Sequence, residues 1–154
     1  MSFRVTGLDP ATFRDLHFLS SAALAERGMR RIRIESAHAA PCRVSLDDAE
    51  IGEHVLLLNY RHQPADTPYY QQGPIFVRET DTRFESVGAL PPALARRPLS
   101  LRGFDREDMM IEADLVEGVE AGPLIERFFA NPSVAYIHAH YARRGCYAAL
   151  IERA

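Results

Sequence analysis

Apolar and polar residues alternate along several stretches of the chain, as in strands with one face toward water. From Arg31 onward the apolar residues occupy every second position, and residues 42–46 repeat the pattern with Cys42, Val44 and Leu46 on one face. Residues 54–60 are continuously apolar for most of their length, which is typical of a central strand. Because the polar residues 47–52 between them favour a turn, we expect 42–46 and 54–60 to form a hairpin.

Other segments complete a mixed pattern of strands and short helices. Asp9 and Pro10 open a helical entry segment, and a second short helix over 21–27 ends at Gly28. An i, i+3, i+4 apolar stripe predicts a helix over 121–130, and residues 90–97 suit a short proline-started helix. Further strands are expected at 3–8, 75–80, 99–104, 109–116, 134–141 and 146–152.

These elements predict an α+β fold, mainly antiparallel sheet with a few short helices at the N-terminus and before the C-terminal hairpin. The 154 residues suit one domain, and the sequence has no repeat or linker that would divide residues 1–154. Residues 62–74 contain three prolines and are expected to form a long ordered loop, a kind of segment that often carries function.

Charge and composition exclude several classes of function. With 18 basic and 21 acidic residues the net charge is −3, so we expect no nucleic-acid partner. All the basic residues are arginine, which removes Schiff-base chemistry and a P-loop lysine. No segment resembles an export signal or membrane span, and two cysteines suit reduced thiols, so we expect a cytoplasmic protein that binds no membrane. No motif identifies a cofactor.

His138 and His140 are the most informative local pair. On a strand, residues two apart share a face, so both imidazoles are candidates for binding one metal or ligand. If Gly145 closes a three-residue hairpin loop, His140 pairs with Ala148 and Cys146 joins the histidine face as a third metal candidate. A two- or four-residue loop instead moves the thiol to the opposite face. His62 is the best remote candidate for a further ligand.

Arginine and tyrosine residues supply candidates for binding an anion. Arg43 follows Cys42 and would favour a reactive thiolate if both faced a polar pocket, although Cys42 also reads as a small core residue. The 62–74 loop carries Tyr69 and Tyr70 and leads to Arg78, which is suited to a carboxylate or phosphate unless it pairs with local acids.

Several runs of sequence together resemble a family. They are PCRVSL at 41–46, GEHVLLLNY at 52–60, ADTPY at 65–69, GPIFVRE at 73–79, YIHAH at 136–140 and GCYAA at 145–149. This combination, which spans nearly the whole chain, resembles the uncharacterised bacterial family known as domain of unknown function 1203. The resemblance implies one bacterial domain and supplies no activity, cofactor or catalytic residue.

The leading hypothesis is a protein or enzyme that binds a small anionic metabolite between the 62–74 loop and the final hairpin. Arg43 or Arg78, with Tyr69 and Tyr70, would hold the anion, and the catalytic candidates are His138, His62 and Cys146. One alternative is a non-enzymatic homodimeric interaction module that uses the last strand or the aromatic loop as its interface. A second alternative is a metal-binding protein that uses His138, His140 and Cys146.

Overall fold

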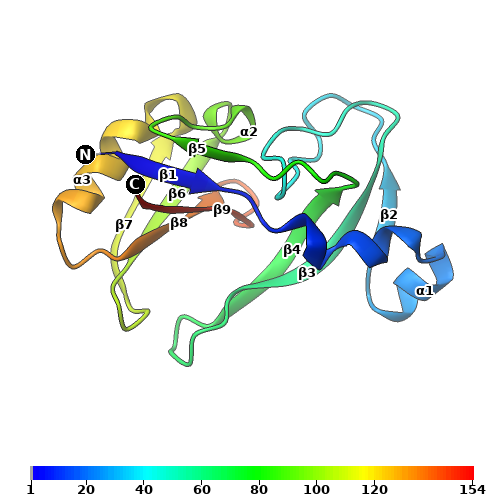
Figure 1. Cartoon of the computed structure of the whole chain (residues 1–154), viewed down its shortest axis with the longest axis horizontal. Coiled ribbons are helices and arrows are strands. Elements are labelled where there is room, and N and C mark those ends of the chain that lie inside the picture. The colour runs from blue at the N-terminus through cyan, green and yellow to red at the C-terminus, as the bar shows by residue number, and fades with distance from the viewer. Residues whose placement is uncertain (1) are drawn as a thin grey trace.

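The computed structural model describes residues 2–154, which form two antiparallel sheets and several short helices (Figure 1). The first half contains β1 (Phe3–Thr6), the 3-10 helices η1 (Pro10–Thr12) and η2 (Arg14–Phe18), α1 (Ser21–Glu26), β2 (Arg30–Arg33), β3 (His54–Gln63) and β4 (Gln71–Arg78). The second half contains β5 (Glu85–Val87), α2 (Pro92–Ala95), β6 (Pro98–Phe104), β7 (Met110–Glu117), η3 (Gly118–Glu120), α3 (Ala121–Ala130), β8 (Tyr136–Tyr141) and β9 (Tyr147–Arg153). The predicted α+β class is therefore confirmed.

The larger sheet has six strands in the order β5-β1-β9-β8-β6-β7. Helix α3 packs on it with the apolar stripe that the sequence predicts, because Leu124, Ile125, Phe128 and Phe129 are all buried. The last strand, β9, lies between β1 and β8 and has no free edge. An interface that adds a strand to β9, one form of the homodimer alternative, is therefore ruled out by the topology.

The smaller sheet has three strands in the order β2-β3-β4, and the entry helices lie beside it (Figure 1). Phe13, which joins η1 to η2, and Leu24 of α1 pack against Leu56 and Val77 in a second apolar core. The side chain of Ser20 caps α1. Gly28 closes the helix with a φ of +74°, and this end of the helix is the one that the sequence predicts.

The segment 42–46 is not a strand, which corrects the prediction of a hairpin with 54–60. Strand β3 pairs with β2 and β4 instead, and only isolated bridges join Pro41 to Asp48 and Cys42 to Phe76. The alternating apolar residues are all buried because the segment crosses between the two cores: Cys42 and Val44 enter the second core and Leu46 enters the first. Burial on two sides produces the same spacing as a half-buried strand.

The proline-rich loop is shorter than predicted. Strand β3 continues to Gln63 and β4 begins at Gln71, so only residues 64–70 remain outside the ladder. Pro74 lies within β4, opposite Asn59, because β4 is an edge strand whose outer side needs no hydrogen bond. Strand β5, which the sequence did not predict, extends the larger sheet by pairing with β1. No helix in residues 2–154 has the length and apolar character needed to cross a membrane.

Candidate functional site

A pocket of about 710 Å³ lies where the two sheets meet. Its walls come from the 38–43 segment, β3, β4, the C-terminal end of α2, the start of β6 and the β8–β9 turn. Five arginines and no carboxylate line it: Arg43, Arg96, Arg97, Arg143 and Arg144. The remaining lining residues are His38, Ala39, Pro41, Leu57, Pro74, Phe76, Pro98, Tyr141 and Cys146. We call this the arginine pocket.

Arg43 is the most deeply buried of these arginines, with only 2% of its surface exposed. Its Nε donates to the carbonyl of Tyr147 at 2.7 Å, and Nη1 donates to the carbonyl of Pro41. The guanidinium also lies over the ring of Tyr141, 4.9 Å from its centroid. Burial lowers the pKa of Arg43, but a guanidinium still keeps its charge at neutral pH. The segment 41–48, which crosses between the two cores, thus holds the positively charged guanidinium of Arg43 in a fixed position between the sheets.

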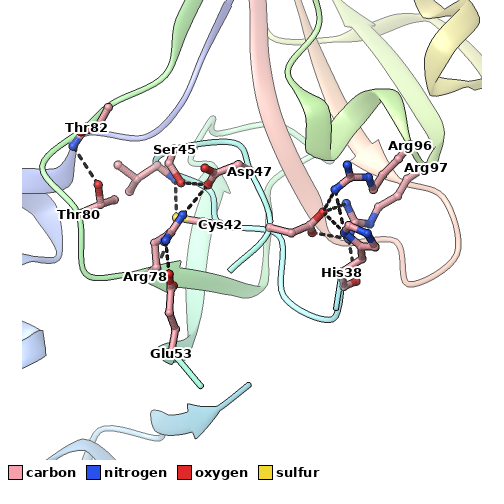
Figure 2. A network of polar contacts seen from close by, with 12 residues as sticks. His38, Cys42, Ser45, Asp47, Glu53, Arg78, Thr80, Thr82, Arg96 and Arg97 are labelled. Atoms are coloured by element: carbon pink, nitrogen blue, oxygen red, sulfur yellow. Dashed lines mark hydrogen bonds and ion pairs between the residues drawn. The ribbon is translucent and has the colours of Figure 1, made fainter. Parts of the chain in front are cut away.

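Asp48 forms ion pairs with the next two arginines of the pocket lining, Arg96 and Arg97. These two side chains lie beside His38 in Figure 2. The carboxylate of Asp48 is nearly buried and accepts hydrogen bonds from both guanidinium groups, with His38 Nδ1 3.1 Å away. Burial alone would raise the pKa of Asp48, but the hydrogen bonds from Arg97 and Arg96 hold it below its usual value. One carboxylate therefore anchors two cations without reaching the pocket surface.

The β8–β9 turn brings the last charged groups to the pocket. Tyr141 N donates to the carbonyl of Cys146 at 2.9 Å, and Gly145 closes the four-residue turn with a φ of +78°. Arg143 and Arg144 are exposed on this turn, and neither forms an ion pair with another residue of 2–154. Two uncompensated guanidinium groups therefore stand at the pocket rim.

A β-bulge sets which side chains of the hairpin face the pocket. Ala139 lies opposite Ala149, but His140 lies opposite Tyr147, so Ala148 has no partner in the ladder. The shift places Cys146 in register with Tyr141 and turns the thiol away from His140. Of the two loop alternatives, the four-residue turn is the one that forms.

Three histidines meet on the other face of the hairpin. The ring of His62, from β3, lies 5.0 Å from that of His140 and 6.0 Å from that of His138. The ring of Tyr147 stacks on His62 at 5.1 Å. Burial lowers the pKa of both His138 and His140 to about 3, so both imidazoles are neutral at pH 7. We call these three residues the histidine cluster.

The predicted metal site is not formed. The structure confirms that His138 and His140 share a face and that His62 joins them, but Cys146 lies in the arginine pocket. Residues 2–154 contain no group of three His, Cys, Asp or Glu side chains arranged to hold a metal ion. The three-ligand set His138, His140 and Cys146 is therefore wrong, because the bulge changes the face of the thiol.

Arg78 lies outside the arginine pocket, contrary to the predicted convergence of Arg43, Arg78 and His138 on one cavity. Its guanidinium forms ion pairs with Asp47 and Glu53 (Figure 2), and these hydrogen bonds outweigh burial and raise its pKa. Such local pairing leaves little of this cation free for a ligand.

The predicted ligand-binding tyrosines, Tyr69 and Tyr70, also lie outside the arginine pocket. Tyr69 packs edge-on against Phe104, with ring centroids 6.2 Å apart. Tyr70 points to solvent with 47% of its surface exposed. Neither residue lines the arginine pocket.

Replacing Arg78 with alanine is expected to lower the free energy of unfolding by about 1–2 kcal/mol, because Asp47 and Glu53 lose their shared cation. Urea unfolding measures this change. Anion binding by the Arg78→Ala protein should equal that of the parent, since the residue does not line the arginine pocket. A stable variant that loses anion binding would contradict this structural role.

Four of the pocket arginines were not among the predicted site residues. They form two doublets, Arg96-Arg97 and Arg143-Arg144, and these doublets are the only signal in the sequence that could have found them. The signal is weak because Arg30-Arg31 is a third doublet and lies elsewhere, on β2. Only the fold distinguishes the doublets that meet from the one that does not.

Comparison with known proteins gives a family and no activity. A family model described as protein of unknown function (DUF1203) matches residues 39–153, which include every lining residue of the arginine pocket except His38. Neither the curated proteins nor the solved structures contain a match to the chain.

Proposed function

The chain belongs to the DUF1203 family of proteins of unknown function, and from that premise we propose that it binds a small anionic metabolite in the arginine pocket. The observation that carries the proposal is the charge of the lining: five guanidinium groups and no carboxylate. Like charges gathered this closely repel one another, and Asp48 offsets only part of that repulsion. A bound anion would stabilise the arrangement.

The shape and chemistry of the arginine pocket support a metabolite rather than a bare ion. A cavity of about 710 Å³ is in the range of pockets that hold small organic ligands. Leu57, Pro74, Phe76 and Pro98 form an apolar wall that can contact the uncharged part of such a ligand. The proposed ligand class is therefore a carboxylate or phosphate with an apolar body.

We also propose that the protein works in the bacterial cytoplasm. Both cysteines, Cys42 and Cys146, are free thiols, which supports a reducing compartment.

Phenyl phosphate is a suitable probe, because it combines an anion with an apolar ring. Isothermal titration at low salt should detect its binding to the parent protein, and phenol should not bind. Removing two rim charges with Arg143→Ala plus Arg144→Ala should weaken the affinity by about tenfold or more, or about 1.4 kcal/mol. Raising the ionic strength should also weaken binding, because salt screens exposed charges.

The matched control is Arg27→Ala plus Arg106→Ala, which removes two exposed arginines that lie outside the pocket. It changes the net charge by the same amount and should leave the affinity for phenyl phosphate unchanged. Equal losses of affinity in the two double variants would mean that the whole surface attracts the anion without a specific site. No binding to the parent protein would reject the proposed function.

A further inference from the structure

The thiol of Cys146 lies in the lining of the arginine pocket and is accessible from it. It is partly exposed, and its sulfur makes one weak contact, 3.9 Å from the carbonyl of Arg144. The other thiol, Cys42, is fully buried and lies 3.4 Å from two backbone N–H groups that point at its sulfur. Only Cys146 stands in a cavity large enough to admit a second molecule.

Tyr141 supplies a second and independent observation at the same place. Only 6% of its surface is exposed, and its buried hydroxyl has no hydrogen-bond partner within residues 2–154. The guanidinium carbons of two pocket cations, Arg43 and Arg97, lie 4.9 and 5.3 Å from the centroid of its ring. Burying a hydroxyl without a hydrogen-bond partner costs folding free energy, unless a ligand or a water molecule forms that hydrogen bond.

Register brings the thiol and the phenol to one side of the hairpin. Tyr141 N donates to the Cys146 carbonyl, and residues opposed across an antiparallel ladder direct their side chains to the same face. Both side chains line the arginine pocket, as do Arg43, Arg143 and Arg144. A nucleophile and several cations thus border one cavity, beside a tyrosine whose buried hydroxyl lacks a partner. A thiol held next to fixed positive charges is a combination that addition to a carbonyl group uses.

We propose, on the basis of the proposed function, that Cys146 is a nucleophile for small carboxylates that carry an aldehyde or ketone carbon. The guanidinium groups hold the carboxylate, and the thiol adds reversibly to the carbonyl carbon. In this step the sulfur–carbon bond forms as the thiol releases its proton to solvent. The carbon–oxygen π pair moves to oxygen, which lies among the pocket guanidinium groups and takes a proton from water. The product is a hemithioacetal, and nothing is oxidised or reduced.

Glyoxylate labelled with ¹³C at its aldehyde carbon tests the adduct directly. The folded parent protein should give a saturable hemithioacetal carbon signal at glyoxylate concentrations at least tenfold below those that glutathione needs. The signal should disappear in Cys146→Ser and persist in Cys42→Ser. A signal of equal size in the parent and in Cys146→Ser would overturn the proposal.

Alkylation provides a second measurement that does not depend on a carbonyl group. Iodoacetate and iodoacetamide both lose iodide to a thiol, but only iodoacetate carries a negative charge. We expect the ratio of their rates at Cys146 to favour iodoacetate at least tenfold more than it does for glutathione. The Arg143→Ala plus Arg144→Ala protein should lose that preference, and Arg27→Ala plus Arg106→Ala should keep it. If the ratio of the iodoacetate rate to the iodoacetamide rate were the same for Cys146 and glutathione, the arginines would not direct anions to this thiol, and the inference would be contradicted.

The outcomes separate the two proposals. If phenyl phosphate binds but no Cys146-dependent adduct forms with glyoxylate, the nucleophile is wrong and the anion pocket remains. If phenyl phosphate does not bind and iodoacetate shows no preference, the proposed function fails together with this inference.

Discussion

Replacing Gly118 with alanine is expected to lower the free energy of unfolding by about 3 kcal/mol or more. An added Cβ would lie 1.9 Å from the carbonyl oxygen of Leu94 and 2.7 Å from that of Arg97. Both are backbone atoms of α2 and its C-terminal end, so no side chain can rotate away to make room. The backbone N–H of Gly118 also donates to the Arg97 carbonyl at 3.0 Å, and the clash would break this bond.

Gly122→Ala is the matched control, because a Cβ at Gly122 meets no atom within 4 Å. This second glycine lies in α3, where alanine is favoured by up to about 1 kcal/mol. Urea unfolding should therefore show a large loss for Gly118→Ala and no loss for Gly122→Ala. Because Gly118 packs on the segment that carries Arg96 and Arg97, residual folded Gly118→Ala protein should also bind phenyl phosphate more weakly. Equal unfolding midpoints for the two variants would show that α2 is not held by this contact.

Acid is expected to destabilise the protein well above the pH at which most carboxylates titrate. Burial first, and then the nearby charge of His140, lower the pKa of His138 to about 3 from an unfolded value near 6.5, and burial does the same for His140. Between pH 6.5 and 3 the unfolded chain therefore binds more protons than the folded one, and stability falls as the pH falls. At pH 5 each of these two histidines should lower the free energy of unfolding by about 2 kcal/mol relative to pH 8.

The charged groups around the histidine cluster also lower the pKa of His138. His62 contacts the pair from β3 and Arg102 lies opposite His138 on β6, and both act to lower the pKa of His138. The aromatic neighbours Tyr136 and Tyr147 carry no charge at neutral pH, since burial raises the pKa of Tyr136 to about 12 and raises that of Tyr147 further. The hydroxyl of Tyr136 donates a hydrogen bond to the carboxylate of Asp108 at 2.6 Å.

His138→Phe tests this pH dependence, because phenylalanine fits the aromatic surroundings and cannot be protonated. Its unfolding free energy, measured in urea at pH 8 and pH 5, should change by about 2 kcal/mol less than that of the parent protein. Replacing the exposed His54 with glutamine is the control and should leave the difference unchanged. A parent protein with equal stability at both pH values would mean that the imidazoles are protonated without cost.

Local sequence patterns predicted most of the fold. The helix at 121–130 and the strand pairs β6–β7 and β8–β9 form close to the predicted residues. The helix and β6 follow from periodicity because each buries one face, whereas β8 is buried on both faces. Residues 42–46 mislead because their alternation comes from burial between two cores. Strand β5 is short and polar, and its pairing with β1 comes from the tertiary fold.

The site was predicted only in part, for a similar reason. The sequence identified Arg43 and Cys146, but left open which face of the hairpin carries the thiol and added Arg78 as a second candidate anion ligand. The fate of Arg78 depends on Asp47 and Glu53, which are distant in sequence and close in space. The arginine pocket takes residues from 38 to 146, and no local pattern reports that these segments meet.

Ala148, which has no partner in the β8–β9 ladder, sets the register of the closing hairpin next to the turn. If Ala148 slipped into the ladder opposite His140, every residue between it and the turn would exchange sides. The sulfur of Cys146 would then stand among imidazoles, and the ring of Tyr147 would move to the guanidinium side. A displacement of one residue would thus move this thiol from the arginine pocket to the histidine cluster, so the extra residue of the bulge decides which set of side chains the thiol meets.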